Sequence, residues 1–331
     1  MVHVHRALGA GCSWAGVRHA AAVARSTAAE NGRMIVRLCV VIAVLPAALR
    51  AQARELEKYG SGSPEAKLML YYSSTVAFSP VGVPLGAERS STTTAASGRA
   101  WSRLELAVEV SYLPPLSAEQ RTAGSDKPEA TNLAPVFARP RLGVRLPGGF
   151  GLEASWIPPV RVFDVKANLF AGALSRSFAV SEQVRLVPRV SVLTGRVEGP
   201  ITCNSETSDD GDAALATYFA LVCYGSDSRD FFEPRHVSGE LMVAGRSSSG
   251  RWEPYLTAGA RSERTQFDVG VIRQDGSRDP DEPILEVKTT RAYGAVGVSW
   301  LGVSRTRLAA ELYYAPGSAL TVRALAGLRL W

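Results

Sequence analysis

The feature that most constrains this chain is a period-two alternation of apolar and polar side chains, repeated in segments of about ten residues. In RLELAVEVSY, residues 103–112, one face carries only leucine, valine and tyrosine. The opposite face carries Arg103, Glu105 and Glu109, with small residues between them. Successive side chains of a β-strand point to opposite sides of its sheet. The segment is therefore predicted to be a strand with one apolar and one charged face.

Similar segments recur toward the C-terminus, divided by clusters of Gly, Pro, Ser and Asp. Besides 102–112, the predicted strands cover residues 136–146, 151–162, 165–176, 184–192, 236–245, 252–262, 290–300, 305–314 and 319–331. Short turns alternate with long polar connections at 114–133, 196–232 and 263–288.

Two architectures produce this alternation. A soluble β-sandwich turns its apolar faces inward, whereas a membrane barrel turns them outward to lipid. Strands of about ten residues match a bilayer crossing, and alternating loop lengths are typical of outer-membrane barrels. Trp101, Trp252, Trp300 and Trp331 would form an aromatic girdle at the periplasmic strand ends. We therefore predict an all-β, antiparallel transmembrane β-barrel of about 10–12 strands with long external loops, and keep a secreted ligand-binding β-sandwich as an alternative.

The N-terminal part reads as a leader. Residues 34–53, MIVRLCVVIAVLPAALRAQA, have the layout of a signal peptide cleaved between Ala53 and Arg54, and residues 1–33 read as an over-long start. Without residues 1–53 the net charge falls from +6 to +1, because six arginines and one glutamate are removed. Charge then gives no reason to expect a nucleic-acid partner. The predicted organisation is a leader at 1–53, an N-terminal segment at 54–100 and a barrel at 101–331.

The exported part keeps two cysteines and one histidine. Cys203 and Cys223 are predicted to form a disulfide across a loop. The remaining histidine, His236, has no cysteine or histidine partners at metal-site spacing, so neither a metal nor a cofactor is expected.

The charged faces of the predicted strands would line the lumen of the barrel. The lumen residues predicted by parity are Arg103, Glu105, Glu109, Arg139, Arg141, Arg145, Glu153, Lys166, Arg185, Arg189, Arg261, Arg291, Arg307, Glu311 and Arg323. They either form ion pairs that fill a narrow barrel or line a basic conduit for anionic solutes.

Residues 100–331 resemble bacterial outer-membrane β-barrel proteins through the signal peptide, the alternation and the C-terminal aromatic residue. The resemblance implies export to the outer membrane, contact with outer-membrane lipid, and insertion by the barrel-assembly machinery, which would read Trp331. Arg329 departs from the pattern, because the family favours an apolar or aromatic residue there. The sequence does not indicate an oligomeric state.

The segment 67–86, KLMLYYSSTVAFSPVGVPLG, is either a first strand or an internal plug. Its stretch AFSPVGVP resembles a motif near the start of the long-chain fatty acid transporter family, whose N-terminus forms a hatch. Pro80, Val81 and Gly82 match loosely, and Ser79 stands where that family has asparagine.

The predicted function is passive passage of small or hydrophobic solutes, or a structural role, without enzymatic activity. The alternative is a membrane-embedded lipid hydrolase. His236, Ser238 and Glu240 share one strand face and would offer a base, a nucleophile and an acid. The His-x-Ser spacing resembles outer-membrane lipid A deacylases.

Overall fold

The structure of the chain is a computed structural model. The residues that it describes are 56–59, 62–85, 103–114, 136–162, 164–205, 216–217, 220–221, 223–277, 284–302, 305–316 and 320–330. The predicted leader with its cleavage site at Ala53 and Arg54, and the girdle residues Trp101 and Trp331, lie outside these ranges.

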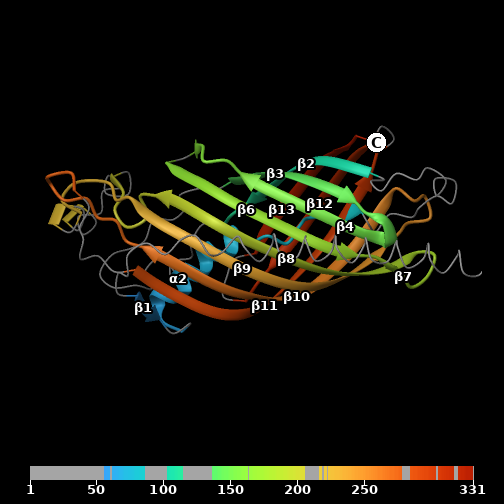
Figure 1. Ribbon diagram of the computed structural model, residues 1–331, viewed down its shortest axis with the longest axis horizontal. Helices are drawn as coiled ribbons and strands as arrows, with labels where there is room; N and C mark the ends of the chain where they lie inside the picture. The colour runs from blue at the N-terminus through green and yellow to red at the C-terminus, as the bar shows by residue number, and fades with distance from the viewer. Residues whose placement is uncertain are drawn as a thin grey trace, which may run out of the picture. The chain divides into compact units, whose positions relative to one another are not determined.

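Ten strands form a closed antiparallel ring (Figure 1). They are β2 (Arg103–Tyr112), β3 (Val136–Arg145), β4 (Phe150–Ile157), β6 (Val165–Arg176), β8 (Val184–Gly199), β9 (Asp230–Gly245), β10 (Trp252–Asp268), β11 (Ile284–Leu301), β12 (Thr306–Tyr314) and β13 (Thr321–Arg329). Each strand pairs with the next, and β13 pairs with β2, from Val322 opposite Tyr112 to Arg329 opposite Glu105. The predicted barrel is confirmed, and the two-sheet sandwich is wrong.

Three short strands and a turn complete the sheet. β5 (Arg161–Val162) pairs with β6, and β7 (Phe178–Ala179) pairs with β8. β1 (Leu56–Tyr59) lies parallel to the first residues of β11. The 3-10 turn η3 (Pro147–Gly149) joins β3 to β4, and Gly148 and Gly149 supply the positive φ angles that this tight connection requires.

The barrel wall has the polarity of a membrane protein. On β2, the side chains of Leu106 and Val108 are 50% and 48% exposed, whereas those of Glu105 and Glu109 are 2% and 1% exposed. The other strands repeat this pattern over most of their length. Apolar side chains outside and charged side chains inside are the arrangement of a transmembrane barrel, because the outer face meets hydrocarbon.

The two ends of the barrel differ. At one end, here the tryptophan end, Trp252 and Trp300 lie opposite each other in the β10–β11 register, with ring centroids 6.4 Å apart. At the other end, here the loop end, strands β8 to β11 reach 16 to 18 residues. This corrects the sequence prediction, which placed residues 196–232 and 263–288 in loops. The added residues still alternate, but there the apolar side chains face inward.

The N-terminal segment lies inside the ring. Helix α2 (Pro64–Thr75) begins after Ser63, whose hydroxyl accepts a hydrogen bond from the Ala66 amide at 3.1 Å, a standard N-cap. The chain then continues in irregular conformation to Leu85, which is 1% exposed. We call residues 62–85 the plug. Of the two readings of the segment 67–86, its described part has the form of a plug, and it adds no strand to the ring.

Within the described part of the chain, no helix combines the length and the apolar character needed to cross a membrane.

A charge placed on the outer face tests the polarity of the wall. Leu256, 60% exposed, is the fifth of the 17 residues of β10 and lies within the outward apolar band, and Ser262 lies on the same outer face nearer the loop end. We expect Leu256→Arg to lower the free energy of unfolding in phospholipid vesicles by about 2–4 kcal/mol, because arginine is costly at the bilayer midplane. Ser262→Arg should cost about 0–1 kcal/mol, since it lies near the interface.

The measurement is urea unfolding followed by tryptophan fluorescence, with the heat-dependent gel shift of folded barrels as a check on insertion. Equal and small effects of both substitutions would mean that the outer face meets water, where exposed substitutions change stability by about 0.5 kcal/mol or less.

Candidate functional site

Most of the predicted lumen residues lie on the inner face. Those buried at 9% exposure or less are Glu105, Glu109, Arg139, Arg141, Arg145, Glu153, Arg185, Arg189, Arg261, Arg307, Glu311 and Arg323. Arg103 and Arg291 occupy inner positions of β2 and β11 and are half-buried.

Lys166 is the exception, and its assignment to the lumen was wrong. On β6 the exposed positions are Phe170 and Leu174, at 51% and 49%, so Lys166 shares the outer parity with them. The inner positions Ala167 and Leu169 pack against α2. The parity rule failed here because it assumed that apolar side chains always face lipid.

Ion pairs connect different strands within the lumen. Arg141 lies 2.9 Å from Glu109 and 3.4 Å from Glu153, and Arg307 lies 3.1 Å from Glu105. These contacts support the reading of an internally paired lumen over that of a free basic conduit. Glu263 also faces inward and pairs with Arg291 at 2.7 Å. The sequence analysis did not predict it as a lumen residue, because it is the first residue of the predicted loop 263–288.

The lumen side chains also serve as hydrogen-bond partners for the plug backbone. Arginine guanidiniums of the wall donate to plug carbonyls, among them Arg139 to Val76 at 2.9 Å, Arg141 to Val81 at 3.0 Å and Arg323 to Ser79 at 3.1 Å. Plug amides in turn donate to wall side chains: Val81 to Glu109 at 3.3 Å, Gly82 to Tyr255 at 3.0 Å and Val83 to Ser299 at 3.2 Å. The irregular part of the plug thus obtains from side chains the partners that a strand obtains from its neighbours.

Two of the three residues of the hydrolase alternative, His236 and Glu240, contact the plug. His236 Nε2 lies 2.6 Å from Ser73 Oγ, and Ser73 donates to Glu263 at 2.8 Å. Glu240 accepts from Ser79 at 2.7 Å and pairs with Arg189. His236, Ser238 and Glu240 therefore share one inner face, as predicted.

This arrangement lacks two requirements of a serine hydrolase. A catalytic histidine is oriented by an acid on its second ring nitrogen, but His236 Nδ1 has no hydrogen-bond partner among the described residues. The hydroxyl that contacts His236 belongs to Ser73, whose side chain is 0% exposed.

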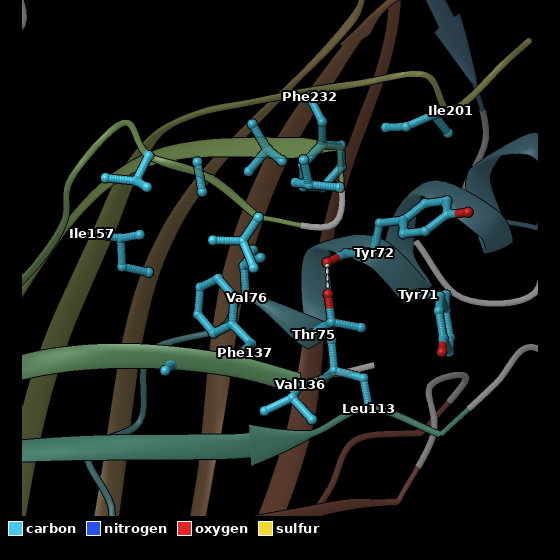
Figure 2. A pocket seen from close by; sticks show the side chains of 16 residues that line it. Tyr71, Tyr72, Thr75, Val76, Leu113, Val136, Phe137, Ile157, Ile201 and Phe232 are labelled. Carbon is cyan, nitrogen blue, oxygen red and sulfur yellow. Dashed lines mark hydrogen bonds between the residues drawn. The ribbon is translucent and has the colours of Figure 1, made fainter. Parts of the chain in front are cut away.

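An apolar pocket of about 440 Å³ opens between α2 and the wall toward the loop end (Figure 2). Its lining comes from α2 (Tyr71, Tyr72, Thr75, Val76), from β3 (Val136, Phe137, Ala138), from β4 and β5 with the turn between them (Ile157, Val160, Val162), from β6 and β8 (Val165, Ala167, Val197), and from Leu113, Ile201 and Phe232.

The few polar atoms of the pocket are already engaged. Thr75 donates to the Tyr72 carbonyl at 2.7 Å, and the Tyr71 hydroxyl donates to the Pro114 carbonyl. Burial raises the pKa of Tyr71, and the neighbouring Tyr112 adds to the shift, so the Tyr71 phenol stays neutral at physiological pH. The pocket therefore offers apolar surface, and the hydroxyls of its helix do not call for a polar ligand.

The barrel wall is incomplete next to this pocket. The β3–β4 register runs only from Arg141 opposite Ser155 to Arg145 opposite Gly151. Residues 136–140 of β3 pair with β2 on one side and have no β4 partner in that register. We call residues 136–140 the wall break. Val160 and Val162 line the pocket together with residues of the wall break. The pocket therefore lies where, in the described part of the chain, the β3–β4 pairing stops at Arg141 and Ser155.

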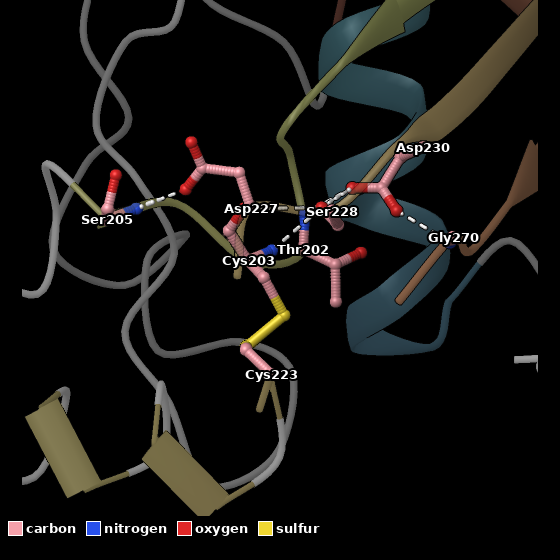
Figure 3. The surroundings of a disulfide bond; sticks show 8 residues. All are labelled: Thr202, Cys203, Ser205, Cys223, Asp227, Ser228, Asp230 and Gly270. Atoms are coloured by element: carbon pink, nitrogen blue, oxygen red, sulfur yellow. Dashed lines mark hydrogen bonds between the residues drawn. A yellow bond between two sulfur atoms is a disulfide. The ribbon is translucent and has the colours of Figure 1, made fainter. Parts of the chain in front are cut away.

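The disulfide lies at the loop end. Cys203 and Cys223 are bonded, as predicted, with Cα atoms 5.7 Å apart (Figure 3). Asp230, the first residue of β9, accepts hydrogen bonds from the amide of Thr202, from Ser228 Oγ at 2.6 Å and from the Gly270 amide at 2.8 Å. The loop that follows β8 is thereby tied to the one that follows β10.

The described residues contain no group of three or more His, Cys, Asp or Glu side chains placed to hold a metal ion.

No protein family description and no curated protein matches the sequence. Solved structures with similar folds include the attachment invasion locus protein Ail of Yersinia pestis, with 10% identity, 69% of this chain and 98% of that one covered, and a TM-score of 0.25. The KdgM porin has 11% identity and a TM-score of 0.28, and the match covers 69% of this chain and 98% of the porin. The toluene transporter TodX of Pseudomonas putida has 9% identity and a TM-score of 0.31, and the match covers 84% of this chain and 98% of TodX. We take the fold from the strand pairing and draw no function from these proteins.

Removing the plug tests whether it closes the lumen. We expect the full chain to show no steady ion conductance in planar bilayers, because plug and ion pairs fill the ring. Deletion of residues 62–85 should produce discrete conductance steps, since the arginines and glutamates of the wall would then face water. The gel shift on heating must show that the shortened barrel is folded. Steady conductance of the intact chain would contradict a closed lumen.

Proposed function

We propose that the protein is an outer-membrane barrel that binds small apolar molecules in the pocket and lets them pass passively between the medium and the membrane through the wall break. The observation that carries this proposal is the coincidence of the apolar pocket with the early end of the β3–β4 register. The outward apolar band and the signal-like segment 34–53 support the membrane location.

The size and lining of the pocket favour an apolar ligand. Small-molecule pockets span about 300–1,000 Å³, and the pocket volume of about 440 Å³ falls within this range. Its walls come mostly from valine, isoleucine, phenylalanine and alanine. A polar ligand would lose its hydration there without gaining partners, whereas an apolar one would gain about 25 cal/mol for each Å² removed from water.

A path along the barrel axis is less favourable than one through the wall. The plug occupies the lumen and bonds to β2, β3, β10, β11 and β13 through Glu109, Arg139, Arg141, Tyr255, Ser299 and Arg323. At the wall break a ligand would meet Val136, Phe137 and Ala138 instead, and the lining of the pocket includes no charged residue. Passage of this kind needs only a concentration gradient.

The basic conduit for anionic solutes is less supported. Arg141 and Arg307 are paired with glutamates, and Arg139 and Arg323 also bind plug carbonyls. An anion entering the lumen would have to compete with these partners.

Filling the pocket tests the proposed function. Ala167 on β6 lines the pocket, and Ala154 on β4 faces outward with an exposed side chain. We expect Ala167→Phe to lower binding of the fluorescent apolar probe N-phenylnaphthylamine by about tenfold, because the new ring occupies the ligand volume. The matched control Ala154→Phe should leave binding unchanged.

Binding is measured by titrating the probe into barrels in nanodiscs, with empty nanodiscs subtracted. Uptake of the same probe by cells expressing each variant gives the rate of passage. Probe binding or uptake that is equal in the wild type and in Ala167→Phe would exclude the pocket as the ligand site.

A further inference from the structure

Three cations stand in one row across the outer face of the wall. In the strand registers Arg235 on β9 lies opposite Arg264 on β10, and Arg264 lies opposite Lys288 on β11. All three side chains face outward, with exposures of 50%, 43% and 58%. Neighbouring strands are about 4.8 Å apart, so the row spans roughly 10 Å of wall. We call these residues the cation row.

The cation row lies directly beyond the apolar band. On β10 the outward positions run from Trp252 through Leu256 to Ser262, and Arg264 follows twelve residues after Trp252. A rise of about 3.3 Å per residue and a tilt of about 45° place it roughly 28 Å above the tryptophan end, close to the ~30 Å thickness of the hydrocarbon core. On β9, the next outward residue toward that end is Val237, which is 58% exposed.

The inner face of the wall changes character at the same level. Val197, Phe232, Phe267 and Val287 face inward and pack in one cluster with α2. Val287 directly precedes Lys288. Toward the tryptophan end the charged side chains of these strands face inward and the outward side chains are mostly apolar, whereas beyond this level these four apolar side chains face inward and Arg196, Glu233 and Gln266 face outward. Both faces therefore mark the same boundary, that between hydrocarbon and headgroups.

The cations outnumber their carboxylate partners. Glu286 contacts both Arg264 and Lys288, the latter at 3.1 Å, and also accepts from Gln266. Glu233 lies 3.8 Å from Arg235, and it also pairs with Arg196 on β8 at 2.6 Å. Among the described residues, four cations thus share two carboxylates, Glu233 and Glu286.

Such a row needs an external anion. Like charges directly opposite each other across strands are destabilising, and the two carboxylates offset only part of this charge. We propose that the cation row binds the phosphate groups of a phosphorylated membrane lipid whose acyl chains lie on the apolar band below. Charge-assisted bonds from guanidinium to phosphate would complete the row. The inference rests on the membrane placement of the proposed function but involves neither the pocket nor the wall break.

The test measures binding of diphosphoryl lipid A to the detergent-folded full chain by native mass spectrometry. The variant is Arg235→Gln/Arg264→Gln/Lys288→Gln. The matched control, Arg176→Gln/Arg251→Gln/Arg305→Gln, removes the same charge from exposed positions toward the tryptophan end. We expect the row variant to bind about tenfold or more weakly, and the control to bind as the wild type does, because each cation near an anionic lipid surface adds to the attraction.

Two further comparisons sharpen the result. Dephosphorylated lipid A should bind weakly to the wild type, no better than diphosphoryl lipid A binds to the row variant. Added salt should weaken only the part of the binding affinity that depends on the phosphates. Equal binding by the row variant and the wild type, or equal binding of both lipids, overturns the proposal. The gel shift on heating shows that each variant is folded. Binding of N-phenylnaphthylamine tests the pocket separately. The lipid-binding inference and the proposed function can therefore be contradicted independently of each other.

Discussion

The requirement that every backbone N–H and C=O find a partner away from water governs this molecule. Lipid offers no partner, so a sheet that crosses it must close on itself. The pairing of β13 with β2 closes the ring here. The wall break is the place where this rule is relaxed, and Pro140 within it has no N–H to satisfy. A strand segment that is paired on one edge only needs cover on the other, and the apolar side chains of the pocket lie beside it. The opening is thus a consequence of where pairing ends.

The same requirement explains why the lumen is charged and yet filled. The plug passes through the ring in irregular conformation, so its carbonyls and amides need side-chain partners. Arg141 bonds a plug carbonyl and also pairs with Glu109, which in turn accepts from the Val81 amide. These contacts depend on one another, because Arg141 and Glu109 each bond a plug backbone group as well as each other. Removing one member of such a buried pair costs about 3–5 kcal/mol, since the remaining charge is left without compensation. The network therefore holds the plug in one position, and the lumen charges serve this purpose before any solute.

The alternation in the sequence was sufficient to predict an antiparallel barrel of about 10–12 strands and the inward position of most of the charged residues, because side chains alternate between lipid and lumen along each strand. This rule fails where the inside is apolar. Ala167 and Leu169 turn inward to meet α2, so Lys166 was placed on the wrong face, and the ends of β8 to β11 were assigned to loops. Helix α2 has no distinct polar face in its sequence PEAKLMLYYSST, and only its surroundings show why it is buried. The cation row could not be predicted from the sequence, because it depends on how β9, β10 and β11 are aligned with one another.

The exchange of polarity along β8 to β11 unites these features. Toward the tryptophan end the barrel is built as a membrane protein, with charge inside. Toward the loop end it is built as a soluble domain, with Phe232, Phe267 and Val287 around α2 and with Arg264 and Lys288 outside. Toward the loop end the outward positions of these strands are mostly polar, and their apolar side chains pack in a hydrophobic core inside the ring around α2. The apolar pocket shares Val76, Ala167, Val197, Ile201 and Phe232 with that core, and it lies beside the wall break. Under the proposed function, an apolar molecule would remain on apolar surface between the core and the lipid, whereas a charged solute on the axial route would meet ion pairs.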